Sequence, residues 1–198
     1  MKKILDNKLA GIILAVILLL VAAYAYVPQV LEGKVVNQSD ISGYMGMARE
    51  CTQWDAAHPD DKTAWSNSMF GGMPNVTFAP PSGGDWTRKL YNLLLTGRRP
   101  ASFMFLSLLG AFLLMLALGI NPLIAAGGAI AVTFCAYNPQ IIQVGHNTKM
   151  QAIAFFPWVL AALVFTYRQV LSSAKWLPKA LLGAVFFGVA LSFQVKAN

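Results

Sequence analysis

Residues 9–27 read LAGIILAVILLLVAAYAYV, a run of 19 residues without a charged side chain. As an α-helix, this run is about 28 Å long, which is enough to cross the hydrocarbon core of a bilayer. Ala23-Tyr24-Ala25 resembles a signal-peptidase site, but the run is longer than the ~7–15 residues of a signal-peptide core. We therefore interpret it as an uncleaved membrane anchor.

Four more uncharged runs, rich in Leu, Ala, Phe and Val, occupy residues 101–120, 123–137, 152–167 and 180–195. Charged residues make up only 12% of the 198-residue chain, against about a quarter in soluble domains. This composition, with only two cysteines, excludes a disordered tail, a collagen-like fibre and a disulfide scaffold. The sequence predicts an all-α membrane protein with about five transmembrane helices.

The basic residues predict the orientation, because short cytoplasmic loops are rich in Lys and Arg. Two groups of basic residues predict the same, cytoplasmic side. They are Lys2, Lys3 and Lys8 near the first run, and Arg168, Lys175 and Lys179 between the last two runs. We expect residues 1–27 to form a cytoplasmic N-terminus and the first transmembrane helix, 28–100 an extracytoplasmic loop, and 101–198 four further transmembrane helices. The last predicted span finishes at the end of the chain, so we expect the front part of a longer, truncated protein.

The formal net charge of +7 does not indicate a nucleic-acid partner. Residues 101–198 contain five basic side chains and no acidic one. The excess of positive charge follows the membrane topology and does not form one basic face for a duplex. The expected partner is therefore the lipid bilayer.

The large loop, residues 28–100, is expected to carry short interfacial helices. One helical pattern begins at Ser39-Asp40 and ends at His58-Pro59. After turn-rich segments at 67–74 and 79–84, a second helix is predicted over residues 85–95. The apolar faces of these helices would lie against the outer leaflet.

Asp40 is the candidate for acid–base chemistry, because every carboxylate except Asp6 lies between Glu32 and Asp85. One interpretation makes Asp40 a general base that removes a proton from an acceptor hydroxyl. The other makes it the N-cap of its helix. The other acidic residues of the first helix and the turn after it, Glu50, Asp55, Asp60 and Asp61, are interpreted as a solvated surface.

The sequence predicts no metal site and no firm cofactor. Asp60-Asp61 lack the set of ~6–8 oxygen ligands that a calcium ion needs, so a divalent cation stays only an alternative. His58 and His146 are far apart in the sequence, and no Cys/His pattern has the spacing of a zinc site.

A second polar cluster, residues 143–149 (QVGHNTK), is predicted as a short outer connection between the third and fourth spans. It would bind a lipid phosphate or a sugar, with Lys149 as counter-charge and His146 and Asn147 as hydrogen-bond donors. The alternative is an ordinary hydrated loop with a snorkelling lysine. Arg98 and Arg99 leave the same choice between a binding role and lipid headgroup anchoring.

Three blocks of the sequence resemble the amino-terminal part of YfhO-like bacterial membrane proteins. These blocks are residues 33–40 (GKVVNQSD), 65–74 (WSNSMFGGMP), and 145–149 (GHNTK) with the run 152–157 that follows. That family is classed with the GT-C-type glycosyltransferases, so the resemblance implies a GT-C-like but incomplete fold in the bacterial cytoplasmic (inner) membrane. It also implies transfer of a sugar from a polyprenyl-phosphate carrier to a cell-envelope acceptor at the outer face.

The resemblance implies roles for particular residues. Asp40 occupies the place of the catalytic acidic residue in the first outer loop. Tyr44 and Trp65 would stack on a sugar ring, and cations near the interface would neutralise the carrier phosphate. The residues expected to bind substrate are Tyr44, Trp65, Asn67, Arg98, Arg99, His146, Asn147 and Lys149.

Two other functions stay open. A transporter or flippase for a lipid-linked substrate would place polar groups within its spans near the membrane midplane. Here the polar clusters lie at the outer interface, which favours surface chemistry. A non-catalytic membrane scaffold predicts that the charges of Asp40 and Lys149 affect only stability.

Overall fold

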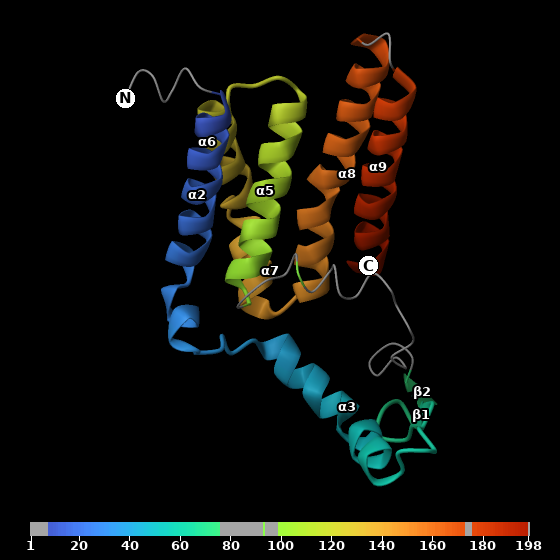
Figure 1. Cartoon of the computed structure of the whole chain (residues 1–198). Coiled ribbons are helices and arrows are strands. Elements are labelled where there is room, and N and C mark those ends of the chain that lie inside the picture. The colour runs from blue at the N-terminus through green and yellow to red at the C-terminus, as the bar shows by residue number, and fades with distance from the viewer. Residues whose placement is uncertain (1–7, 76–92, 94–98, 173–175, 198) are drawn as a thin grey trace. The chain divides into compact units, whose positions relative to one another are not determined.

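The computed structural model describes residues 8–75, 93, 99–172 and 176–197 (Figure 1). The chain forms two compact units. We call residues 1–36 with 89–198 the bundle unit, and residues 37–88 the loop unit. The predicted helix over 85–95 lies outside the described residues except at Leu93.

The bundle unit is built from apolar helices. The central helix α5 (Ala101–Ala117) packs against α2 (Lys8–Tyr26), α6 (Pro122–Thr133) and α8 (Asn147–Ser172). On the far side of α8 lies α9 (Trp176–Ala197), and α7 (Tyr137–Val144) packs against α8 (Figure 1). A short 3-10 helix, η1 (Pro28–Glu32), follows α2.

Three helices of the described chain, α2, α8 and α9, are long and apolar enough to cross a membrane. The bent pair α6 and α7 would make a fourth span, and α5 is a shorter apolar helix of 17 residues. Large apolar side chains on α2 and α9 are exposed, among them Val21 (61%) and Val185 (64%). The mostly helical fold is therefore confirmed, and three helices that are suited to crossing a membrane support the membrane prediction.

The core lies where α5 meets α8. Phe103, Phe112 and Phe155 are fully buried there. Gly110 makes room for the ring of Trp158, because a Cβ at this position would lie 2.5 Å from Trp158 Cδ1. The Trp158 Nε1–H donates to the Leu106 carbonyl at 3.0 Å, so the two helices are joined by a hydrogen bond as well as by packing.

The predicted span over 123–137 is bent: the helix breaks after Thr133 and resumes at Tyr137 with a 50° bend. Pro139 explains the break: in a continuous helix its missing N–H would leave the Cys135 carbonyl unpaired, and its ring would clash with that carbonyl. The side chain of Asn138 donates to the Thr133 carbonyl at 3.0 Å, which satisfies a group freed by the break.

The loop unit contains α3 (Ser39–Ala57) and a small hairpin of β1 (Trp65–Ser66) and β2 (Met73–Pro74). The strands are antiparallel, with Trp65 opposite Pro74 and Ser66 opposite Met73. The helix runs between the residues that the sequence marks as its start and stop, but with 19 residues it is not short. Its buried residues Ala48 and Cys51 pack under Met69 and Met73.

Candidate functional site

Asp40 lies in the first turn of α3 but does not cap it. The N-cap position is Gln38, and no side-chain cap hydrogen bond is present. The predicted N-cap role of Asp40 is therefore wrong, because the helix begins two residues earlier than that role requires. A carboxylate in the first turn still interacts favourably with the positive end of the helix dipole. Tyr44, 42% exposed, lies one turn further on the same face.

Trp65 lies on β1, with half of its side chain exposed. Its ring lies over Gly72, where a Cβ would come within 2.9 Å of the indole. Gly72 also has a φ of 119°, which other residues rarely adopt. One face of the ring is thus supported by the hairpin, and the rest is open to solvent.

Glu50 organises the tip of the hairpin, a role that the sequence did not indicate. One carboxylate oxygen accepts from the Ser66 hydroxyl at 2.7 Å, the Ser68 N–H at 2.8 Å and the Asn67 N–H at 3.0 Å. These hydrogen bonds, led by the Ser66 hydroxyl and then the Ser68 N–H, lower the pKa of Glu50. Glu50 thus lies at the surface, as the sequence predicts, and its carboxylate also has a structural role in the hairpin.

A cleft of about 420 Å³ opens beside Glu50 on α3. Its lining combines an aromatic ring with charged and amide groups: Gly46, Arg49, Glu50, Gln53, Trp54 and Ser68. The spacing of the helical residues places them on one face of α3, which is the signal that the sequence offered for this cleft. Trp54 stacks on His58 with ring centroids 4.0 Å apart, and its indole N–H donates to the Asp61 carbonyl at 2.9 Å.

The loop unit does not gather its four predicted site residues in one place. The hairpin packs on the second half of α3, where Glu50 meets Asn67, and Asp40 lies at the opposite end of that helix (Figure 1). Ten residues of helix correspond to about 15 Å. Trp65 and Asn67 therefore belong with Glu50, and Asp40 belongs with Tyr44.

The predicted connection over residues 143–149 is mostly helical, which corrects the loop interpretation. Gln143 still belongs to α7, and α8 begins at Asn147. Only Gly145, with a φ of 111°, and His146 join the two helices. A glycine in this left-handed conformation ends α7 at once, which leaves no room for a longer loop.

Lys149 and Arg99 are two of the described cations at this end of the bundle unit. The Lys149 ammonium lies 5.2 Å from the Tyr137 ring centroid, and the Arg99 guanidinium lies 5.5 Å from that of Phe103. Both are cation–π distances. The turn between α7 and α8 lies at the same end of the bundle as the start of α5 (Figure 1). Arg98 lies outside the described residues.

A buried polar group inside the bundle unit was not predicted. The hydroxyls of Ser107 and Thr133 lie 3.2 Å apart, and Asn138 bonds to the Thr133 carbonyl. All three residues are buried. Polar residues within a membrane bundle at a helix break have two uses, satisfying the freed backbone and binding a substrate.

Within the residues that the structure describes, no group of three or more His, Cys, Asp or Glu side chains is arranged to hold a metal ion. The predicted site residues therefore fall into two sets. Asp40, Tyr44, Trp65 and Asn67 belong to the loop unit, and Arg99, His146, Asn147 and Lys149 belong to the bundle unit.

Comparison with known proteins gives no matching family model, no matching curated protein and no matching solved structure. The resemblance to YfhO-like proteins thus stays a prediction.

Proposed function

We propose that this chain is part of a GT-C-like membrane glycosyltransferase, which moves a sugar from a polyprenyl-phosphate carrier to a cell-envelope acceptor. In this proposal the bundle unit crosses the inner membrane five times, with the N-terminus in the cytoplasm. The supporting observation is a separation of charge. Among the described residues of the bundle unit, the sole carboxylate is Glu32, whereas the loop unit contains five described carboxylates.

The chain's connectivity supports a common membrane face for these groups. Helix α2 ends, and α5 begins, at the end of the bundle where Lys149 and Arg99 lie (Figure 1). The loop unit is the segment between those two helices, so the chain leaves the bundle unit and returns to it at that end. Cations at that face suit the phosphate of a carrier lipid, because ammonium and guanidinium groups form charge-assisted hydrogen bonds to phosphate oxygens.

The proposed chemistry is an inverting transfer with one base. Asp40 takes the proton of the acceptor hydroxyl, whose oxygen forms the new bond to the anomeric carbon. The bond from that carbon to the carrier phosphate breaks, and its electron pair stays with the phosphate. Lys149 and Arg99 compensate the charge of that leaving phosphate. Tyr44, on the same face of α3 as Asp40, offers a ring for a sugar to stack on.

The test measures transfer of radiolabelled sugar from a panel of polyprenyl-phosphate donors, in membranes that contain the chain. Asp40→Asn removes the base and keeps the shape, so we expect transfer to fall by about 100-fold or more. The matched control is Asp60→Asn, the same change on an exposed carboxylate of the same unit, and it should transfer normally. Equal transfer by wild type and Asp40→Asn contradicts the proposed base.

A transporter or flippase is the second candidate, and the bent pair α6 and α7 is the observation that favours it. Transporters bind substrates at broken helices, where backbone groups are freed from the helix. In this case wild-type chain in vesicles would move a fluorescent lipid-phosphate across the bilayer, and Asn138→Leu would stop the movement. A scaffold would show neither activity, and Asp40→Asn and Lys149→Gln would change only stability.

A further inference from the structure

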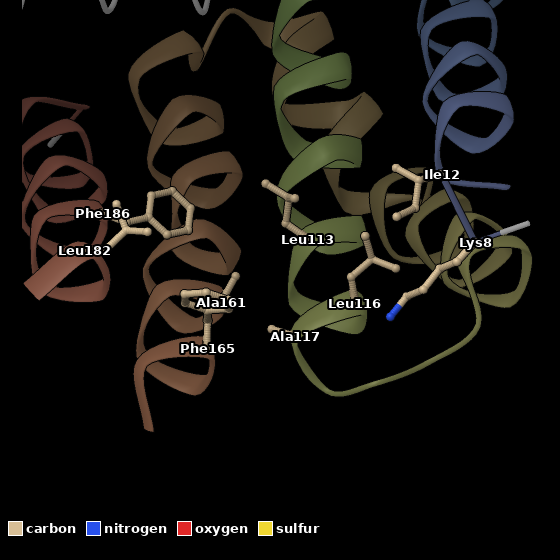
Figure 2. Close-up of a pocket in the computed structure, with 9 residues that line it drawn as sticks. All are labelled: Lys8, Ile12, Leu113, Leu116, Ala117, Ala161, Phe165, Leu182 and Phe186. Carbon is tan, nitrogen blue, oxygen red and sulfur yellow. The ribbon is translucent and has the colours of Figure 1, made fainter. Parts of the chain in front are cut away.

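An apolar slot lies between helices at the end of the bundle unit opposite Lys149. Its volume is about 580 Å³, which falls in the usual range for ligand pockets. Helices α2, α5, α8 and α9 each supply side chains to it, and all but Lys8 are apolar: Ile12, Leu113, Leu116, Ala117, Ala161, Phe165, Leu182 and Phe186 (Figure 2). The slot therefore suits a hydrocarbon chain.

The slot continues into a polar mouth. A second cavity of about 600 Å³ shares Lys8, Leu116, Ala117 and Phe165 with the slot and adds Arg168 and Gln169 to its lining. Arg168 is held in place, because its Nη1–H donates to the Ala117 carbonyl at 2.7 Å. Its side chain is nevertheless exposed, so the guanidinium can still bind an anion.

The charged side chains that the structure describes around the mouth are all basic. Lys8 begins α2, Arg168 lies near the end of α8, and Lys179 lies in the first turn of α9, so all three are at the same end of the bundle (Figure 1). Among the described residues of the bundle unit, Glu32 is the single carboxylate, and it lies beyond the other end of α2, paired with Lys34. Among the described residues, a negatively charged headgroup therefore meets no opposing carboxylate at the mouth.

We propose that this slot and mouth bind an anionic phospholipid, with one acyl chain between α5 and α8 and the headgroup phosphate at Lys8 and Arg168. The apolar slot and the cationic mouth match the two parts of such a lipid. Basic pockets between transmembrane helices are known sites for anionic headgroups. The site lies in the leaflet at the Lys8 end, which is the cytoplasmic leaflet by the positive-inside prediction. It does not depend on the proposed glycosyl transfer.

The test is photo-crosslinking in phosphatidylcholine vesicles that contain the wild-type chain. The probe is phosphatidylglycerol with a diazirine on one acyl chain, compared with phosphatidylcholine carrying the same diazirine, and mass spectrometry locates the labelled peptides. We expect phosphatidylglycerol to label the slot-lining segments of α5 and α8 more strongly than phosphatidylcholine does. Lys8→Gln should reduce that labelling about fivefold.

Three further variants separate the chain pocket from the charge. Ala117→Phe fills the slot and keeps every charge, so it should abolish labelling. If its circular dichroism shows that it does not fold, Leu182→Trp replaces it, because Leu182 is 64% exposed at the edge of the slot. Lys34→Gln, the same charge change at the other end of α2, should label as wild type does.

Several results would overturn the proposal. They are equal labelling by both lipids, labelling that persists after the slot is filled, and labelling that excess inorganic phosphate removes. The last result would show that the mouth binds phosphate and does not recognise the lipid. Crosslinks between two copies of the chain at these residues would mean that a second protein molecule occupies the slot.

Discussion

At the residue scale, the carboxylate of Glu50 holds together a hairpin whose partners follow it by 16 to 18 positions in the sequence. Ser66, Asn67 and Ser68 donate to a single oxygen, and such charge-assisted bonds are stronger than bonds between neutral groups. The buried Cys51 lies beside Glu50 in the sequence, and its thiol donates to the Trp65 carbonyl at 3.7 Å. The reactivity of the Cys51 thiol therefore reports whether the hairpin is closed.

Glu50→Gln should open the hairpin, because an amide replaces the charged acceptor. The measurement is the rate at which maleimide modifies Cys51, in a chain whose exposed Cys135 is changed to Ser. We expect modification to be several-fold faster in the Glu50→Gln variant. Asp60→Asn removes a charge from the same unit and should leave the rate unchanged, whereas a faster rate there would contradict a specific role for Glu50.

The lowered pKa of Glu50 also predicts the effect of acid. The folded chain holds the proton on Glu50 less readily than the unfolded chain does, so the ionised group stabilises the fold above the ordinary pKa of 4.5. That contribution is lost as the pH falls through the lowered pKa. Thermal unfolding can be followed by tryptophan fluorescence. Between about pH 5 and 3, the unfolding temperature should fall further in wild type than in Glu50→Gln. Equal losses would contradict this prediction.

Gly110→Ala should destabilise the bundle unit by about 1–3 kcal/mol, because the new methyl group would meet the Trp158 ring. Gly127→Ala is the matched control, since no heavy atom lies within 4 Å of a Cβ at that helical position. It should be neutral or stabilising by up to about 1 kcal/mol. Thermal unfolding in detergent, followed by circular dichroism, measures both. Equal effects of the two changes would show that contact with Trp158 does not cause the loss of stability.

At the scale of elements, the break between α6 and α7 depends on side chains that replace backbone hydrogen bonds. Asn138→Leu removes the donor to the buried Thr133 carbonyl, and we expect a loss of about 1–3 kcal/mol. The control Gln143→Leu makes the same kind of change at an exposed position of α7. Thermal unfolding followed by circular dichroism again gives the comparison, and an unchanged midpoint for Asn138→Leu would mean that another group satisfies the carbonyl.

Start and stop residues in the sequence predicted the bounds of an element well. Contacts between residues far apart in the sequence were not predicted. The bounds of α3 follow from Ser39-Asp40 and His58-Pro59, which act within one turn of the helix. The break in the third predicted span was missed because its residues are as apolar as a straight span, although Pro139 was a visible signal. Glu50 looked like a surface acid because nothing near it in the sequence identifies its hydrogen-bond donors.

At the scale of the whole molecule, the predicted site residues divide between the two units, so sequence proximity could not show which of them act together. The proposed topology makes a direct prediction instead. A cysteine replacing Asp60 should react with a membrane-impermeant maleimide in intact cells, and a cysteine replacing Leu171, 68% exposed near the end of α8, should not. Both variants need Cys51 and Cys135 changed to Ser. Labelling at the two positions with the opposite pattern would reverse the predicted orientation.

The hydrogen bond from Trp158 to the Leu106 carbonyl joins residues 52 positions apart, and this has a consequence for biosynthesis. The central helix α5 leaves the ribosome with α2 and α6 as its available neighbours, and its Gly110 notch stays empty until α8 has been synthesised. Release of a chain before that point leaves α5 with an unfilled side. The packing of α5 is thus completed late in translation, when α8 enters the membrane and packs against the α5 that is already there.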